Sequence, residues 1–279
     1  MIHLNKKSSG GFTLMELVIT ITIIALIMSI VLAAVRNSRE KARIAKAQQF
    51  SQRINHIVGA YAIGIWRFES IEAGNRLIDN SGYSHYGVNH GANLNSAGIK
   101  GNCLEFDGVS DYVDIPNSSD MNAEGITIEA WIYPYDSSPL QLIVSKYSNT
   151  GDKDYGFGIH NGHLYIWYGS GGDYTNHLGT IKTYKWQHIA LVFKGWDSYE
   201  AYIDGKLIGS DSGTFHQRAS TTANVEIGRA GGSIGAHYFN GLIDEVKIYN
   251  QALPTVEIEK HYAQKIEHYK DLTLGVLNY

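Results

Sequence analysis

A single acidic residue, Glu16, interrupts a long apolar segment near the start of the chain. The segment covers residues 12–35 and reads FTLMELVITITIIALIMSIVLAAV. A carboxylate inside an apolar helix is costly unless a cation pairs with it or water is near, so such residues are functional candidates. The chemistry expected of Glu16 is therefore charge pairing.

Cysteine and histidine, which commonly hold metals or act in catalysis, form no recognisable motif in this chain. The one cysteine, Cys103, excludes an internal disulfide, and its strand-like surroundings (GNCLEFDG) favour a small buried side chain. No CxxC or HExxH motif occurs. Twelve histidines are scattered along the chain, and the polarity of the loop around His85 and His90 explains that pair without a metal.

Aromatic residues beside segments rich in glycine, aspartate and asparagine are the candidate ligand contacts. Sugar recognition needs aromatic platforms and polar loops on one rim. Five residues meet this description: Tyr147, Tyr155, Trp167, Tyr168 and Tyr174. The alternative is that strand aromatics are core residues; it is favoured for Trp131 and Trp186 and open for Trp167.

Charge divides the chain into two different parts. The 279 residues carry a net charge of −4, but residues 1–58 hold eight Lys/Arg and two Glu, so they carry +6 and the remainder −10. An acidic domain binds phosphate poorly, so nucleic acid is not the expected partner. A hydrophobic content of 44% with 30 glycines is typical of a chain with a core and many tight turns.

The apolar segment has the length of a membrane span. As one helix, residues 12–35 rise about 36 Å, enough to cross a hydrocarbon core of roughly 30 Å. No A-x-A-like cleavage site follows, so a cleaved secretory signal fits poorly. No Pro or Gly interrupts residues 12–58, which predicts a stalk continuing to about residue 60. The six Lys/Arg after the span favour a cytoplasmic C-terminal side, but long folded domains are exported largely regardless of charge.

The run KKSSGGFTLMELVITITIIALI resembles the leader and first helix of type IV prepilins, which include the pseudopilins of type II secretion. The resemblance implies that a prepilin peptidase cuts after Gly11 and methylates the new amine of Phe12. It implies that Glu16 then pairs with that amine on a neighbouring subunit. The implied partners are other pilins, in a homo- or heteropolymer through the N-terminal helix. The implied location is the bacterial inner membrane before assembly, then an extracellular filament or the cell surface, with the head exported.

From about residue 61 the pattern changes to short alternating runs. Residues 126–133 alternate apolar and polar or aromatic side chains, and residues 186–193 are apolar on both faces, as in a central strand. Asn161-Gly162 and Asp204-Gly205 each separate two such runs and predict two-residue hairpins. Many short strand-like runs separated by turn residues favour a β-sandwich or barrel. Residues 255–271 predict a closing helix.

Several landmarks in this part resemble the concanavalin A-like, laminin-G-like family, a two-sheet jelly roll. They include CLEFDGVSDYVDIP, ITIEAWIYP, KWQHIALVF, YIDGKLIG and YFNGLIDEVKIYNQAL, in the family's order. The expected fold class is α+β: a long membrane-spanning pilin helix followed by an all-β sandwich. The expected divisions are a leader (1–11), a transmembrane and stalk helix (12–60), the sandwich (61–262) and a C-terminal tail (263–279).

The same resemblance implies Ca²⁺ as a candidate cofactor, because relatives hold this hard cation through loop carboxylates and carbonyls. The residues that match the family's recurring acids are Asp79, Asn80, Asp107 and Asp244. The alternative is that Asp79 forms an Asx turn and Asp107 a turn before Gly108.

Some relatives hydrolyse glycosides, which requires two carboxylates facing one cleft. The Glu-x-Asp-x-x-Glu run of the glucanase members is absent. Adjacent residues of a strand point to opposite faces, so Asp244 and Glu245 are expected to point apart. No catalytic residue and no enzyme activity are therefore expected.

The sequence thus predicts a type IV pilin-like filament subunit whose lectin-like head adheres to glycan or protein at the cell surface. Two alternatives stay open. One is a type II secretion pseudopilin with a structural head, and the other is a signal-anchored lectin-like protein or hydrolase that does not assemble.

Overall fold

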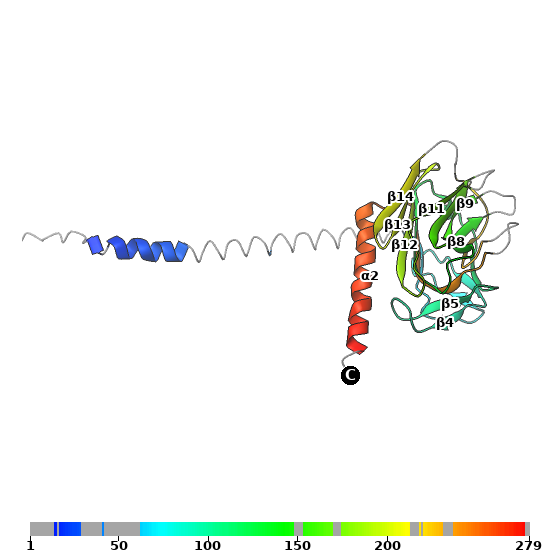
Figure 1. The fold of residues 1–279 in the computed structure, drawn as a ribbon, viewed down its shortest axis with the longest axis horizontal. Helices are drawn as coiled ribbons and strands as arrows, with labels where there is room; N and C mark the ends of the chain where they lie inside the picture. The colour runs from blue at the N-terminus through cyan, green and yellow to red at the C-terminus, as the bar shows by residue number, and fades with distance from the viewer. Residues whose placement is uncertain are drawn as a thin grey trace, which may run out of the picture. The chain divides into compact units, whose positions relative to one another are not determined.

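The computed structural model describes the chain in segments (Figure 1). These are residues 14, 15, 17–28, 41, 62–147, 153–169, 174–212, 218, 220–230 and 237–276. The chain divides into two compact units, residues 1–59 and residues 60–279. The second unit is called the head.

In the first unit, residues 14, 15 and 17–28 are helical. No helix among the described residues combines the length and the apolarity needed to cross a membrane. Gly11, Phe12 and Glu16, the predicted processing and assembly residues, lie outside the described residues.

The head is a sandwich of two eight-stranded antiparallel sheets, which confirms the predicted fold class. The first sheet has the order β14 (Lys206–Ser212), β13 (Ser198–Ile203), β12 (Gln187–Phe193), β7 (Ile126–Pro134), β16 (Asn240–Tyr249), β5 (Cys103–Asp107) and β4 (Asn93–Asn95), with β1 (Ala62–Trp66) also paired to β16. The second has the order β11 (Tyr174–Leu178), β10 (His163–Gly169), β9 (Lys153–His160), β8 (Gln141–Tyr147), β15 (Val225–Ile227), β6 (Tyr112–Ile115), β3 (Gly87–His90) and β2 (Arg76–Leu77). A 3-10 turn, η1 (Ser119–Asn122), precedes β7.

Local sequence patterns account for the strands and their turns. Alternate residues of β7, from Ile126 to Ile132, lie in the main core between the sheets. Asn161 and Gly162 have φ of 51° and 77°, and Asp204 and Gly205 have φ of 51° and 73°. Two consecutive positive φ values are what a type I′ hairpin requires, so both predicted hairpins are confirmed. Every residue of β12 is buried, as predicted for a central strand.

Helix α2 (Thr255–Val276) packs on the outer face of the first sheet (Figure 1). Tyr262 stacks on Trp131 with 5.8 Å between ring centroids, and Lys265 Nζ lies 2.6 Å from Glu245 Oε1. The closing helix predicted over residues 255–271 is confirmed, and it extends to Val276. Trp131 and Trp186 are buried as predicted, but in a second cluster outside the main core.

A β-bulge in β16 places two acidic side chains on the face that α2 covers. The pairing with β7 shifts between Asp244 and Lys247, and Glu245 has a φ of 48°. The bulge adds a residue to the strand and so breaks the alternation of faces. The Glu245 carboxylate forms an ion pair with Lys265 of α2. Burial raises the pKa of the neighbouring Asp244, and the negative charge of Glu245 raises it further. The prediction that these two carboxylates point apart is therefore wrong.

We expect His188, buried beneath α2, to contribute to the loss of stability in acid. It is 1% exposed, and burial lowers its pKa to about 4, against about 6.5 in an unfolded chain. Between these values only the unfolded chain binds the proton, so stability falls as pH falls through this window. His188→Gln is expected to remove up to about 3 kcal/mol of this loss.

The measurement is urea unfolding of residues 60–279 at several pH values within that window, for the native head and the variant. Burial raises the pKa of Asp154 to about 6, which acts in the opposite direction. The difference between the two proteins isolates His188 from this effect. An identical pH dependence in both proteins would contradict the expectation.

Candidate functional site

An aromatic groove on the outer face of the first sheet is the strongest candidate for a ligand site. It encloses about 320 Å³. Four aromatic side chains line it together with three smaller residues: Tyr133, Tyr135, Tyr184, Trp186, Asn95, Ala97 and Leu242. This set is called the aromatic groove.

Two neighbouring strands bring the four rings together. Tyr133 and Tyr135 come from the end of β7, and Tyr184 and Trp186 come just before β12, which pairs with β7. Tyr184 N donates to the carbonyl of Pro134 at 2.8 Å, which ties the second segment to the first. Tyr135 and Tyr184 are stacked with centroids 5.9 Å apart, and Tyr133 lies 5.7 Å from Trp186. The rings therefore form one continuous aromatic wall.

Tyr184 presents its ring to solvent from an unusual backbone conformation. Its φ is 55° and its side chain is 66% exposed. A non-glycine residue in this region costs about 1–3 kcal/mol, and such strain gathers at ligand sites. The exposed ring adds little to folding and is free to contact a ligand.

Polar groups fix the orientation of the rings. Glu105 accepts a hydrogen bond from the Tyr135 hydroxyl at 2.8 Å and another from Asn95 Nδ2 at 2.9 Å. Trp186 Nε1 donates to the carbonyl of Ala97 at 3.2 Å. Burial and the Glu105 carboxylate both raise the pKa of Tyr135, so its phenol stays neutral. The stacked pair of Tyr135 and Tyr184, edged by amide, carboxylate and hydroxyl groups, can stack on a sugar ring and exchange hydrogen bonds with its hydroxyls.

The five aromatic residues predicted from sequence are not part of this groove. Tyr155 and Tyr168 are 1% and 2% exposed in the main core, so their prediction as ligand contacts is wrong. Tyr147 and Trp167 pack together outside that core with Ala230, with ring centroids 5.4 Å apart, and both are buried. Tyr174 lies in β11, and its side chain is outside the described residues.

A signal for the groove exists in the sequence. WIYPYD contains three aromatic residues at two-residue steps, the last two being Tyr133 and Tyr135, and KTYKWQ contains two, Tyr184 and Trp186. At strand spacing, such pairs share one face. The pairing of β7 with β12 is what places the two pairs side by side, and no local pattern specifies that pairing.

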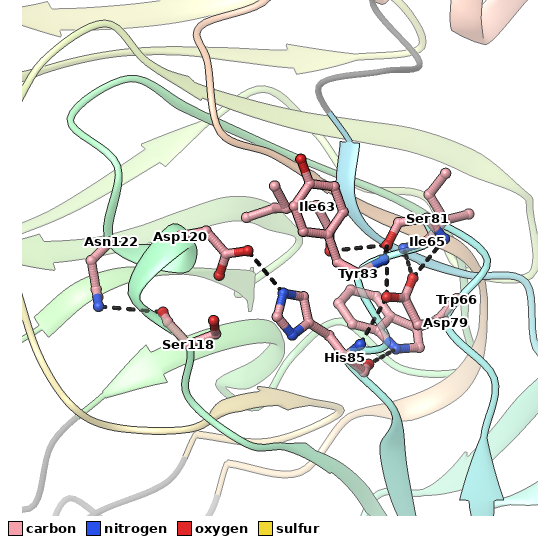
Figure 2. A network of polar contacts seen from close by, with 10 residues as sticks. All are labelled: Ile63, Ile65, Trp66, Asp79, Ser81, Tyr83, His85, Ser118, Asp120 and Asn122. Carbon is pink, nitrogen blue, oxygen red and sulfur yellow. Dashed lines mark hydrogen bonds and ion pairs between the residues drawn. The ribbon is translucent and has the colours of Figure 1, made fainter.

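Asp79, a predicted metal ligand, holds a loop against β1 (Figure 2). Its Oδ1 accepts from the backbone N–H groups of Ile65 and Ser81 at 2.9 and 2.8 Å, and its Oδ2 accepts from the Ser81 hydroxyl and the His85 N–H. The His85 ring lies 3.0 Å from Asp120. All of these are contacts within the protein, as the Asx-turn alternative proposes.

The other predicted metal ligands lie in separate networks. Asp107 accepts three backbone N–H groups of the turn that follows it, and Asp244 accepts from Lys100 N and Glu245 N. Asn80 donates its N–H to a carbonyl of β1. Within the described segments, no three His, Cys, Asp or Glu side chains gather where they could hold a metal ion. The predicted set therefore does not fit one shared Ca²⁺ site, while Ca²⁺ binding as such stays a prediction.

Two family models match the sequence. The model described as the concanavalin A-like lectin/glucanases superfamily matches residues 107–259, and that of the prokaryotic N-terminal methylation motif matches residues 6–32. No curated protein matches the chain.

Solved structures share the fold of the head. The botulinum neurotoxin serotype D binding domain has a TM-score of 0.60 at 16% identity, covering 75% of this chain and 53% of its own. The binding domain of Paraclostridial Mosquitocidal Protein 1 has a TM-score of 0.60 at 17% identity, covering 74% and 52%. This chain thus spans about half the length of these two domains.

A smaller structure is matched over nearly its whole length. Domain 4 of AbnA, a GH43 extracellular arabinanase from Geobacillus stearothermophilus in complex with arabinotriose, has a TM-score of 0.57 at 17% identity, covering 71% of this chain and 97% of its own. At these identities the likeness shows the fold alone. The family models show that the chain belongs to the concanavalin A-like lectin/glucanase superfamily and joins that domain to a prokaryotic N-terminal methylation motif.

Proposed function

We propose that the chain is a filament subunit whose head binds a glycan at the cell surface. The methylation motif and the sandwich support a type IV pilin-like surface protein with a lectin-like head. The motif implies a membrane-anchored precursor that a prepilin peptidase processes and that polymerises with other pilins. On this proposal the cut follows Gly11, and Phe12 becomes the first residue of the filament form.

The aromatic groove is the observation that carries the glycan proposal. Its rings come from two adjacent strands, and the most exposed of them, Tyr184, is held in a strained conformation. Sugars stack their apolar faces on such rings while polar groups at the edge fix their hydroxyls. The arabinotriose complex of the arabinanase domain supports a saccharide as the ligand class.

We propose that the head binds without hydrolysis. Asp244 and Glu245 are adjacent carboxylates of β16, but they are only 0% and 3% exposed beneath α2. Glu129 is also buried, and its nearest charged partner is His261 of α2 at 3.0 Å. A glycan therefore has no access to these groups. Release of reducing sugar by the purified protein would contradict this proposal.

Tyr184→Ala is expected to weaken glycan binding by about tenfold, which corresponds to about 1.4 kcal/mol. The ring is mostly exposed, so its removal is expected to leave the melting temperature nearly unchanged. The measurement is a glycan array with the full-length protein in detergent, followed by titration calorimetry with the glycan that binds.

Tyr83→Ala is the matched control, because Tyr83 is also an exposed tyrosine, at 48%, but lies outside the groove. If the native protein and Tyr184→Ala bind the glycan with equal affinity, the glycan-binding site lies outside the aromatic groove.

A further inference from the structure

A second cavity lies beside the segment that supplies half of the aromatic groove. It encloses about 340 Å³, and three lysines line it together with side chains of β12, β14 and α2. Lys182 and Lys185 precede β12, and Lys206 begins β14. These three residues are called the lysine pocket.

The lysine pocket is a local excess of positive charge in an acidic part of the chain. All three lysines are exposed. Within the described part of the head, none of their ammonium groups forms an ion pair with a carboxylate. Three like charges around one cavity repel one another, and an anion bound among them relieves that repulsion.

The acidic groups at the pocket do not neutralise it. Asp204 lines the cavity, and its Oδ1 accepts a hydrogen bond from the backbone N–H of His188 at 3.0 Å. Burial raises the pKa of Asp204, while the charges of all three lysines act to lower it. Glu259 of α2 is exposed, and its backbone lies beside Gly205. Even with both acids ionised, the pocket keeps a net positive charge.

One short segment forms a wall of both cavities. In KTYKW, Tyr184 and Trp186 line the aromatic groove, while Lys182 and Lys185 line the lysine pocket. Lys182 N donates to Gln187 Oε1 at 2.6 Å, which fixes the segment to the start of β12. The two cavities therefore lie on either side of one five-residue segment, within the span that the proposed ligand has to bridge.

We propose that the head binds an acidic glycan, with a sugar ring in the aromatic groove and a carboxylate or sulfate among Lys182, Lys185 and Lys206. This inference rests on the proposed glycan-binding function and specifies its ligand class. Ammonium groups form charge-assisted hydrogen bonds with such anions, and these are stronger than neutral ones. The lysine pocket then selects acidic over neutral sugar chains.

The test compares three oligosaccharide probes of equal length on the full-length protein in detergent. One is carboxylated (an oligogalacturonate), one is sulfated and free of carboxylates (a dextran sulfate fragment) and one is neutral (an arabino-oligosaccharide). We expect at least one acidic probe to bind at least about tenfold more tightly than the neutral one. We also expect the affinity for this acidic probe to fall as salt is added. The triple variant K182Q/K185Q/K206Q is expected to lose this advantage and to keep the neutral affinity. The acidic probe that binds more tightly shows whether the lysine pocket prefers a carboxylate or a sulfate.

Lys185→Gln and Lys194→Gln form a matched pair, because each removes one exposed lysine at opposite ends of β12. Only Lys185→Gln is expected to lower the affinity for the acidic probe. If all probes bind equally and the triple variant changes nothing while Tyr184→Ala weakens binding, the lysine inference is wrong and the glycan-binding function stands. If the native protein binds none of the probes or any arrayed glycan, both fail.

Discussion

Glu16→Ala is expected to give a protein that enters the membrane and is processed but is at least about tenfold depleted from filaments. On the proposed function, a cut after Gly11 within the matched methylation motif leaves a positive amine on Phe12 at the start of the apolar segment. Each buried charge, the amine and the Glu16 carboxylate, then needs a partner that assembly supplies. Removing one partner leaves the other charge uncompensated, which is costly in an apolar environment. The depletion is measured as the ratio of the protein in sheared surface material to that in membranes.

The intact mass and the first residue of each fraction complete this measurement. A methylated chain that begins at Phe12 in the sheared material establishes a processed filament subunit. Glu40→Ala is the control, because Glu40 is the one other acid of residues 1–58 and lies beyond the apolar segment. Normal incorporation of Glu16→Ala would refute the pairing.

Two results separate the alternative functions: the first residue of the chain in these fractions, and enzyme export after deletion of the protein. A chain that begins at Met1 and is confined to membranes favours a signal-anchored lectin-like protein. Loss of enzyme export on deletion of the protein favours a pseudopilin of type II secretion.

Asp154→Ala is expected to destabilise the head by about 3–5 kcal/mol. Asp154 in β9 is fully buried, with Arg218 Nη1 at 3.1 Å from Oδ1 and Lys146 Nζ at 3.7 Å from Oδ2. Both cations are also buried, and Lys146 Nζ donates to the carbonyl of Thr221 at 2.6 Å. Burial raises the pKa of Asp154 to about 6, so at neutral pH it is ionised and balances one of the two cations. Its removal leaves two buried cations without a counter-charge.

The loss is measured by urea unfolding of residues 60–279 at neutral pH, since the head is a compact unit with its own core. Lys194→Ala is the control, because Lys194 pairs with Glu200 at the surface. An exposed pair contributes at most about 1 kcal/mol. A comparable small loss in Asp154→Ala would contradict a stabilising role for the buried carboxylate.

Much of the architecture was predictable from sequence, because it depends on interactions between near neighbours. Asn161-Gly162 and Asp204-Gly205 tolerate positive φ, so each specifies a hairpin regardless of the rest of the chain. The alternation in β7 separates a core face from an outer face for the same local reason. The methylation motif is likewise a contiguous run of residues, which a family model matches directly.

The binding surfaces depended on contacts between distant segments, which only the tertiary structure decided. Pairing of β7 with β12 assembles the aromatic groove, and the β13–β14 hairpin brings Lys206 to Lys182 and Lys185. The bulge at Glu245 brings this carboxylate to Lys265, twenty residues later in the chain. Tyr155 and Tyr168 resemble ligand contacts in sequence, but the second sheet turns them into the core. The sequence by itself thus determined the methylation motif, the fold class and the turns. Which side chains meet, and which of them water can reach, was decided by the packing of sheets and helix.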